Sequence, residues 1–436
     1  MTTTKRAASA LALGAAIALL ASGCAGRAAP GGLDNVQTIT WWHNSTQTAA
    51  KDYYDKVAND FERDHPGVNV EVTALEHSDM LARLDATLES DDPEQVPDVF
   101  MSRGGGELEG EVAAGVTRDL TKVAAEELAK ISRFTNDYTV DGKVYALPYS
   151  MGIVGFYYNT DLFEQAGITE VNPSPTIDEF NGWIDQLQAA GIPPISVGAG
   201  DKWPAAHYWF YNVVRECTYD TVEAAIASKS YADPCFLRAG ESLSALVAKQ
   251  PFNEGYATTA AQEGPTSASG LLANGQVAME LAGHWEPGLV GGLRADGTVP
   301  DTLSWFAYPT FPGQAGDPLD QMGGGDAWEV STSAPDVAVD LAKYLLSDEV
   351  QKGFAELNMG LPTNPAAADS IAFPALQDLV AVRDKASRAP QLYLDTRLGS
   401  KIGDPLVAEI YKVFTGESGA QQVVDAINAA ANGSTE

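Results

Sequence analysis

The sequence lacks the short motifs on which most enzymatic and metal chemistry depends. The phosphate-binding GxxxxGKS/T loop, the GxSxG nucleophile elbow, the HExxH zinc motif and a paired CxxC are all missing from its 436 residues. The 5 histidines are scattered, and none stands beside a cysteine or a second histidine at the spacing of metal ligands. We therefore expect no metal site, no cofactor and no enzymatic activity.

Basic residues are also scarce. Lys and Arg together number 27 against 59 Asp and Glu, which gives a formal net charge of -32. A surface of that sign repels the phosphate backbone of nucleic acids and anionic lipid head groups. We therefore expect no nucleic-acid partner, and the simplest role of the charge is to keep the surface hydrated.

Long apolar runs are missing except near the N-terminus. There a basic start precedes an Ala/Leu-rich run over residues 7–21, which is too short to span a bilayer comfortably. The segment LASGC, which ends at Cys24, resembles the lipobox of bacterial lipoproteins, in which cleavage precedes the cysteine and its sulfur receives a diacylglycerol. We predict a signal peptide over residues 1–23, lipidation of Cys24, and a flexible anchor and linker over residues 24–36. An ordinary secretory peptide with an incidental cysteine is the alternative.

Cysteine is rare, with 3 residues in the whole chain. Once Cys24 is assigned to the anchor, Cys217 and Cys235 remain as one pair in an oxidising compartment. We predict a structural disulfide between them, with two buried free thiols as the alternative.

The length and the periodicity of the chain predict two α/β lobes. A chain of 436 residues exceeds the size at which a single core keeps growing. Buried strands are predicted over residues 39–42, 68–72 and 99–101, with amphipathic helices between them, which makes a β-α-β-α-β unit. Such units form mainly parallel sheets whose ligands lie beyond the carboxyl ends of the strands. The loops that begin at WWH, EH and SR are placed there.

The middle and the end of the chain continue the α/β pattern. Extended segments are predicted over residues 145–148, 152–158 and 195–197. The segment TIDE at Thr176 is a capping box that opens a helix. Further helices are predicted over residues 337–346, 375–385 and 406–413.

Aromatic residues beside small polar or glycine-rich loops are the strongest functional signal. A pyranose ring has an apolar face and a rim of hydroxyls, so its binding site needs flat aromatic surfaces and fixed hydrogen-bond partners. Four loops offer both kinds of group: WWHNS, GDKW, GHWE and GGGDAW. Their candidate contacts are Trp42, His43, Asp201, Lys202, Trp203, His284, Trp285, Asp326 and Trp328.

Each candidate also has a structural role to weigh. Trp203, Trp285 and Trp328 can pack in a core instead of lining a site, and the aspartates can cap helices. Core positions are expected for Trp41, Trp183, Trp209 and Trp305. Because side chains alternate along a strand, Trp41 and Trp42 face opposite sides, so at most one of them can reach a ligand.

Several segments in order resemble the extracellular solute-binding proteins of carbohydrate ABC importers. They are the lipobox, WWHN, PDVFMSRGGGELE, GKVYALPYSMGIVGFYYNTDLFEQAGI, GLLANGQVAMELAGHWEPG, YPTFPGQ and GGGDAW, and they span nearly the whole mature chain. GDKWPAAHYWF and the region of Cys217 and Cys235 look most like actinobacterial lipoproteins that bind xylobiose and related oligosaccharides.

The resemblance implies a two-lobed, periplasmic-binding-protein-like α/β fold with three hinge crossings and a sugar in the cleft. The first lobe would contain residues 37–150 and 313–360, and the second residues 151–312 and 361–436. It implies a monomer on the outer face of the cell membrane that delivers a small carbohydrate to the permease of an importer. The sugar contacts that carry over are Trp42, His43, Glu76, Tyr149, Trp203, Trp285 and Asp326, with Tyr393 and Asp395 in QLYLD as further candidates.

One residue departs from the family pattern. Many relatives have a small residue where His284 precedes Trp285. His284 either donates to a sugar hydroxyl or packs away from the cleft.

Two other functions stay open. A secreted glycoside hydrolase would share aromatic clefts, and 59 acidic residues provide many carboxylate pairs by chance. A lipoprotein for another solute, such as a polyol, a peptide or a metal, is the second alternative.

Overall fold

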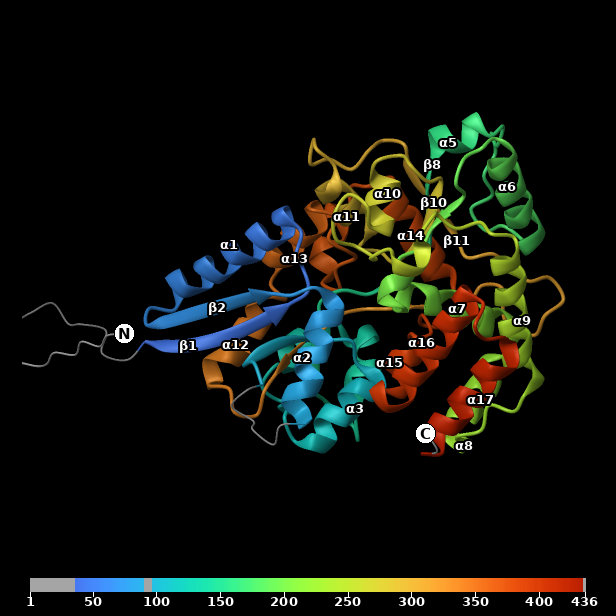
Figure 1. Cartoon of the computed structure of the whole chain (residues 1–436). Coiled ribbons are helices and arrows are strands. Elements are labelled where there is room, and N and C mark those ends of the chain that lie inside the picture. Colours follow the sequence, from blue (N-terminus) through green and yellow to red (C-terminus); the bar gives the residue numbers. More distant parts are fainter. Residues whose placement is uncertain (1–35, 90–95, 434–436) are drawn as a thin grey trace, which may run out of the picture. The chain divides into compact units, whose positions relative to one another are not determined.

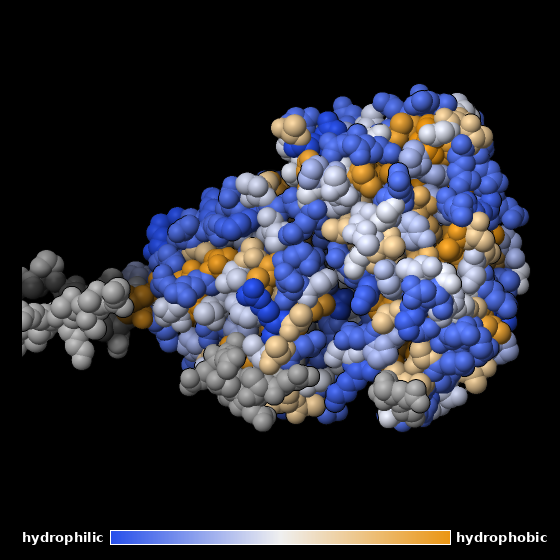
Figure 2. Space-filling model, in the orientation of Figure 1, coloured by the Kyte–Doolittle hydropathy of each residue, from blue (hydrophilic) through white to orange (hydrophobic). Residues whose placement is uncertain are grey.

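A computed structural model describes residues 36–89 and 96–433. The predicted signal peptide and Cys24 lie outside the described residues, as does the predicted linker up to residue 35. In the described part of the chain, no helix combines the length and apolar character needed to cross a membrane. The face shown in Figure 2 is largely hydrophilic, as the net charge of -32 leads one to expect.

The first sheet has five strands in the order β2-β1-β3-β13-β6. Figure 1 shows β1 and β2 side by side in it. Strand β1 pairs in parallel with β2 and β3, whereas β13 runs antiparallel to both β3 and β6. The predicted β-α-β-α-β unit is confirmed, but the sheet as a whole is mixed because β13 enters it from far along the sequence. Its strands are β1 (Gln37–His43), β2 (Val68–Ala74), β3 (Val99–Ser102), β6 (Ala146–Pro148) and β13 (Ala327–Val330).

Strand β1 shows why the first sheet forms where it does. Ile39, Trp41 and His43 are buried on one face, whereas Trp42 is half-buried on the other, so the predicted alternation is confirmed. Helix α1 (Thr48–Asp64) buries its apolar stripe, which includes Tyr54, in the same core cluster as Ile39 and Trp41. The strand ends at His43, and the loop that follows it reaches the site described below.

The second sheet has four strands in the order β11-β8-β10-β9. Strand β8 is antiparallel to β10 and β11, and only β10 and β9 are parallel. Helix α7 (Trp203–Glu216) is buried along its whole length from Pro204 onward and contributes to the core of this sheet. The strands are β8 (Gly155–Asn159), β9 (Ile195–Ser196), β10 (Met279–Ala282) and β11 (Leu303–Ala307).

Two short pairings do not belong to either sheet. Strand β7 (Gly152–Ile153) pairs with β12 (Gly323–Gly324), and Ser150 bridges to Pro362. Cβ atoms at Gly323 and Gly325 would lie 2.2 and 1.8 Å from backbone oxygens, so only glycine permits this approach. A further hairpin joins β4 (Thr139–Val140) to β5 (Lys143–Val144).

The remaining helices cover the sheets, and those that were predicted are present. The capping box at Thr176 opens α6 (Ile177–Ala189), as expected. The helices predicted over residues 337–346, 375–385 and 406–413 correspond to α12 (Asp336–Tyr344), α14 (Pro374–Lys385) and α16 (Ser400–Thr415). The others are α2 (His77–Glu89), α3 (Gly105–Ala114), α4 (Ala125–Lys130), α5 (Thr160–Gln165), α8 (Tyr219–Ser228), α9 (Pro234–Ala248), α10 (Ala268–Ala273), α11 (Glu286–Leu293), α13 (Asp348–Glu356), α15 (Leu394–Leu398) and α17 (Ala420–Ala431).

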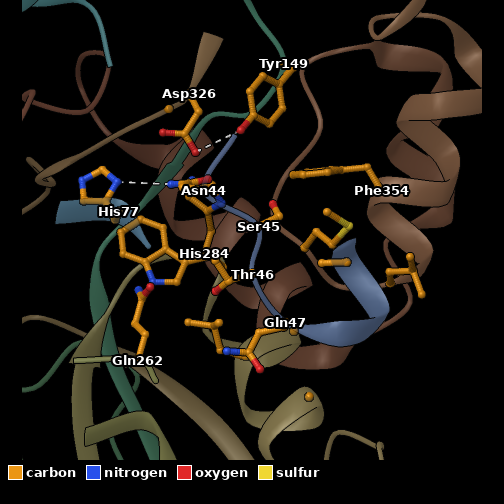
Figure 3. Close-up of a pocket in the computed structure, with 18 of the residues that line it drawn as sticks. Asn44, Ser45, Thr46, Gln47, His77, Tyr149, Gln262, His284, Asp326 and Phe354 are labelled. Atoms are coloured by element: carbon orange, nitrogen blue, oxygen red, sulfur yellow. Dashed lines mark hydrogen bonds between the residues drawn. The ribbon is translucent and has the colours of Figure 1, made fainter. Parts of the chain in front are cut away.

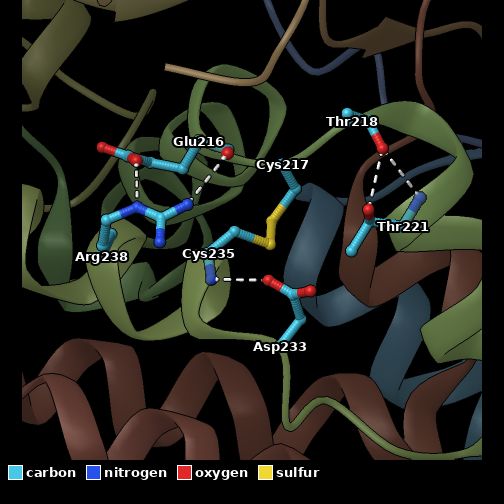
Figure 4. The surroundings of a disulfide bond; sticks show 7 residues. All are labelled: Glu216, Cys217, Thr218, Thr221, Asp233, Cys235 and Arg238. Atoms are coloured by element: carbon cyan, nitrogen blue, oxygen red, sulfur yellow. Dashed lines mark hydrogen bonds and ion pairs between the residues drawn. A yellow bond between two sulfur atoms is a disulfide. The ribbon is translucent and has the colours of Figure 1, made fainter. Parts of the chain in front are cut away.

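The predicted disulfide between Cys217 and Cys235 is present (Figure 4). It joins the end of α7 to the first turn of α9, where Asp233 accepts a 2.9 Å hydrogen bond from the Cys235 amide. Closing a loop of 18 residues stabilises a fold by about 3 kcal/mol in the chain-entropy model. The bond therefore ties the C-terminal end of α7 to the start of α9.

Candidate ligand-binding site

A cavity in the described body encloses about 1100 Å³ of space not filled by protein atoms, part of it open to solvent. Loops at the carboxyl ends of β1 and β3 line it, together with the first residues of α2 and α7. Figure 3 shows the loop after β1, from Asn44 to Gln47, and His77 at the start of α2. We call one set of lining residues the polar wall: Asn44, His77, Arg103, Tyr149 and Asp326. We call the other set the aromatic wall: Trp203, His207, Trp285 and Tyr393.

Side chains of the polar wall are held by hydrogen bonds to one another. The Asn44 amide nitrogen lies 3.2 Å from Nδ1 of His77, and the Tyr149 hydroxyl donates to Asp326 Oδ2 over 3.4 Å (Figure 3). These four residues come from four separate segments of the chain. Their polar groups are thus oriented before any ligand arrives, which lowers the ordering cost of binding.

Tyr149 rests on the core of the first sheet. Its ring stacks on Trp328 with centroids 4.3 Å apart and planes at 11°. Trp328 in turn meets Trp41 edge to face at 5.4 Å. Because both tryptophans are almost fully buried, the Tyr149 ring is a rigid part of the cavity.

Arg103 is the cation of the polar wall. Its guanidinium donates from Nε to Glu107 Oε2 over 3.2 Å and pairs through Nη2 with the other carboxylate oxygen. Its Nη1 lies 3.8 Å from Asp395 Oδ2. The positive charge is therefore compensated inside the wall.

The aromatic wall is built around the start of α7. Trp203 and Trp285 lie 6.4 Å apart with their planes at 68°. His207, one turn along α7 from Trp203, stacks on Tyr393 at 5.0 Å and 13°. Flat apolar surfaces in two orientations are thus presented to the cavity.

Polar atoms of the aromatic wall lack partners in the described protein. They are Nε1 of Trp203, Nε1 of Trp285, Nδ1 of His207 and the hydroxyl of Tyr393, and all four are buried. Buried indole and phenol groups ordinarily find a hydrogen-bond partner. Three further indole nitrogens without partners, those of Trp41, Trp209 and Trp305, lie in the cores and not at the cavity.

The histidines at the cavity are neutral at physiological pH. Burial, with a smaller contribution from the nearby Arg103, lowers the pKa of His77 and of His207 to about 3. Burial likewise lowers the pKa of His284 to about 3. Each ring can therefore both donate and accept a hydrogen bond but carries no charge.

Asp326 is the titratable group of the polar wall. Burial raises the pKa of its carboxyl to about 6, against the opposing effects of Arg103 and the Tyr149 hydroxyl. The group is therefore mostly ionised at pH 7 and protonated below about pH 6.

Two buried carboxyl groups, which do not line the cavity, lie behind the aromatic wall. Glu280 on β10 and Glu286, which follows Trp285, are both buried and both within reach of the Ser269 hydroxyl, at 3.5 and 3.1 Å. Burial raises the pKa of Glu286 to about 8, with the Ser269 hydroxyl opposing. Glu286 is thus largely un-ionised at neutral pH.

His284 packs between two glycine-containing segments, those of Gly152 and Gly360. Its Nδ1 accepts a 3.3 Å hydrogen bond from the Leu361 amide. A Cβ at Gly152 would lie 2.1 Å from its ring, and one at Gly360 would lie 2.8 Å from Nδ1. The ring therefore occupies space that any side chain at these glycines would need.

A family model described as bacterial extracellular solute-binding protein matches residues 44–352. The chain is a bacterial extracellular solute-binding protein. An uncharacterised ABC transporter extracellular-binding protein of Pyrococcus horikoshii is 22% identical to it over 417 residues, which cover 92% of this chain and 89% of the relative. The multiple sugar-binding protein of Streptococcus mutans is 26% identical over 154 residues, which cover 35% of this chain and 34% of that protein.

Solved structures share the fold of this solute-binding protein. A structure from work on xylan utilization by Caldanaerobius polysaccharolyticus matches with a TM-score of 0.81 and 21% identity, covering 90% of this chain and 99% of the other. A chitin oligosaccharide binding protein matches with a TM-score of 0.80 and 23% identity, covering 92% and 99%. These matches confirm the predicted two-lobed, periplasmic-binding-protein-like α/β fold.

The structure of the solute-binding protein brings six of the predicted contacts to one cavity. They are Tyr149, Trp203, His284, Trp285, Asp326 and Tyr393. Segments more than 240 residues apart in sequence meet there, from Tyr149 to Tyr393. The tryptophans expected in the cores, Trp41, Trp183, Trp209 and Trp305, are buried.

The structure corrects the placement of His43, Trp42 and Trp328, which do not line the cavity. His43 is fully buried between Trp41 and Tyr54, because it lies on the inward face of β1. Trp42 lies half-buried on the opposite face, and Trp328 lies under Tyr149.

Four further predicted contacts are not among the residues that line the cavity. The Glu76 carboxylate accepts from the Ser78 amide at the start of α2, and Asp201 accepts from the Ala261 amide over 2.6 Å. Lys202 is exposed with a φ of 64° where α7 begins. Asp395 faces Arg103, as described above.

The residues that sequence reasoning missed are neighbours of those it named. Asn44 follows His43, and His77 follows Glu76. Arg103 stands in a loop that the strand pattern had placed at the correct edge of the sheet. Sequence patterns located the loops, but the side chain that turns toward the cavity depends on the exact residue where each strand ends.

Proposed function

We propose that this solute-binding protein binds a small carbohydrate whose sugar rings carry no charged group, such as an oligosaccharide of the xylobiose type. It would deliver this sugar to an ABC importer. The partnerless polar atoms of the aromatic wall carry the proposal. Sugar hydroxyls can accept from the indole N–H groups of Trp203 and Trp285, while the apolar face of a pyranose packs on the rings.

The opposite wall supports the same ligand class. Asn44, His77 and Asp326 are oriented by their own hydrogen bonds and can donate to or accept from ring hydroxyls. The sugar ligands named for similar proteins are consistent with this chemistry.

Binding without turnover is the proposed outcome at this site. Among the described lining residues, Asp326 is the sole carboxyl group, whereas glycoside hydrolysis ordinarily uses two that flank the bond. The buried pair of Glu280 and Glu286 does not line the cavity.

Hinge closure is the proposed mechanism. Residues 37–150 and 313–360 would move as one lobe and residues 151–312 and 361–436 as the other, with crossings near residues 150–154, 308–313 and 360–362. A sugar that contacts both walls stabilises the closed state by its differential affinity for it. The closed monomer, tethered through lipidated Cys24 on the outer face of the cell membrane, would then dock on the permease through a local patch.

A solute screen tests the proposal. Thermal shift across sugars, polyols, peptides and metal ions should show stabilisation by xylo- or related oligosaccharides only, since a ligand at a hundredfold excess over its Kd adds about 2.7 kcal/mol. Calorimetry then gives stoichiometry, and prolonged incubation should release no reducing ends. A shift with peptides or metals and none with sugars would overturn the proposal, and steady hydrolysis would replace it with a glycosidase.

A further inference from the structure

The charges around Arg103 bear on which sugars the cavity accepts. Arg103 is the sole guanidinium or ammonium group among the cavity-lining residues that the structure describes, and Asp326 is the sole carboxyl group. Since the histidines in the wall are neutral, these two residues and their immediate partners set the charge that a ligand meets.

Two carboxylates hold the Arg103 guanidinium. The Glu107 carboxylate accepts from both Nε and Nη2 in a side-on ion pair. The Oδ2 atom of Asp395 lies 3.8 Å from Nη1. All three side chains are mostly buried, with exposed fractions of 12% for Arg103, 19% for Glu107 and 13% for Asp395. With Asp326 in the same wall, three carboxyl groups lie near one cation.

Packing of two helices fixes this arrangement. Glu107 lies in the first turn of α3 and Asp395 in the first turn of α15. A Cβ at Gly106 would lie 2.7 Å from the Gly399 amide nitrogen, so the glycine permits the close approach of the two helices. The Asp395 carboxylate is itself oriented by the Thr396 amide, which donates to Oδ1 over 2.8 Å and leaves Oδ2 toward Arg103.

A ligand carboxylate would find the side-on face of Arg103, formed by Nε and Nη2, already occupied by Glu107. The carboxylate of Asp395 lies near the remaining nitrogen, Nη1, and would repel a second carboxylate there. A further negative charge would approach a partly desolvated set of groups with an excess of negative charge, where repulsion is poorly screened. A sugar hydroxyl, which carries no charge, can still accept from the remaining N–H of Arg103.

We propose that Glu107 and Asp395 are specificity-determining residues that restrict the cavity to uncharged sugars and exclude uronic acids. The inference rests on the proposed sugar-binding function and assigns a ligand class within it. It also predicts a gain of function, because removal of either carboxylate frees part of the Arg103 fork for a ligand carboxylate.

The test uses three β1,4-linked disaccharides that differ at one ring carbon. Xylobiose carries hydrogen there, glucosyl-xylose a hydroxymethyl group and glucuronosyl-xylose a carboxylate, so the second sugar controls for size. If the solute screen identifies another neutral sugar, the same three substituents are compared on that sugar. Calorimetry with the full mature chain gives each Kd.

Glu107→Gln and Asp395→Asn are the informative variants, since each keeps shape and removes one charge. Asp336→Asn is the matched control, because Asp336 is an exposed carboxylate paired with an arginine, Arg118, outside the cavity lining. Thermal melts of all four proteins, including the unmodified chain, establish that each is folded.

We expect the unmodified protein to bind glucuronosyl-xylose at least about tenfold more weakly than glucosyl-xylose. Glu107→Gln and Asp395→Asn should narrow that ratio by about fivefold, whereas Asp336→Asn leaves it unchanged. Equal binding of the two sugars by the unmodified protein, or a ratio that neither variant changes, overturns the inference while leaving sugar binding intact. Failure of every sugar to bind defeats the proposed function and the inference with it.

Discussion

The two walls of the cavity meet a ligand in opposite ways. On the polar wall, side chains are hydrogen-bonded to one another, Asn44 to His77 and Tyr149 to Asp326. On the aromatic wall, the polar atoms of Trp203 and Trp285 have no partner in the described protein. The polar wall thus supplies polar groups that are already oriented. The aromatic wall supplies apolar area and hydrogen-bonding groups that are still free in the described protein.

The walls also depend on carboxyl groups in opposite protonation states. Asp326, with a pKa of about 6, is best suited to accept sugar hydroxyls when it is ionised. Glu286, behind the aromatic wall, has a pKa raised by burial to about 8 and is accommodated best when neutral. Rising pH should therefore strengthen sugar binding by Asp326 in the polar wall. It should also destabilise the packing around Glu286 behind the aromatic wall.

The largest expected effect concerns the support of the aromatic wall. The Glu286 pKa is about 4.5 when unfolded and about 8 when folded, so its stabilising contribution is complete below about pH 4.5 and is lost as pH rises to about 8. Glu286→Gln removes this dependence. The free energy of unfolding of Glu286→Gln, relative to that of the unmodified protein, should increase by about 4 kcal/mol between pH 5 and pH 9 in urea titrations. A constant difference across that range would show that Glu286 is not the group responsible.

Removal of aromatic area should have the next largest effect. Trp285→Ala should weaken sugar binding by about 2 kcal/mol, roughly 30-fold, through loss of both the ring face and the indole N–H. Trp285→Phe keeps a face without the donor and should recover part of the loss. Calorimetry measures both, and near-equal affinity of the alanine variant would remove Trp285 from the proposed contacts.

Asp326 should give a smaller effect that depends on pH. If the carboxylate accepts sugar hydroxyls, affinity should rise as pH increases through about 6, because protonation below that pH removes acceptor capacity. Asp326→Asn should weaken binding at pH 7.5 by about 1.5 kcal/mol, roughly tenfold, and abolish the pH dependence. Retention of the dependence in Asp326→Asn would assign it to another group.

Orientation within the polar wall should have the smallest effect. Asn44→Ala removes the partner of His77 without removing aromatic area, and should weaken binding by about 0.5 to 1 kcal/mol. Asn44→Asp keeps an acceptor and tests whether the amide N–H matters. A loss as large as that of Trp285→Ala would break the contrast between the walls.

Much of the fold was predictable because its elements carry strong local patterns. The β-α-β-α-β unit follows from alternating valines and a helical stripe, and the capping box at Thr176 fixed the start of α6. Helix α7 was not predicted, because most of its residues (Trp, His, Tyr, Phe, Asn and Val) have only modest helix propensity. The pairing of β13 with β3 and β6 follows from no local pattern, since these strands are distant in sequence; the family resemblance alone had put residues 313–360 in the first lobe.

The site was predictable at the level of loops, and less so at the level of side chains. Trp203, Trp285 and Asp326 line the cavity, as the aromatic and glycine-rich loops suggested. For the first strand, however, His43 was named and Asn44 lines the cavity. Alternation gives the face of a residue within a strand, but not the direction of the chain once pairing ends.

The ring of His284 has a consequence for how this chain can change by mutation. It fills the volume beside Gly152, so Gly152→Ala alone should disrupt the native packing. Exchange of His284 for a small residue opens that volume and should make the same alanine tolerable. The two positions would then show strong positive epistasis, and lineages with a small residue at 284 would be free to lose the glycine that this chain has to keep.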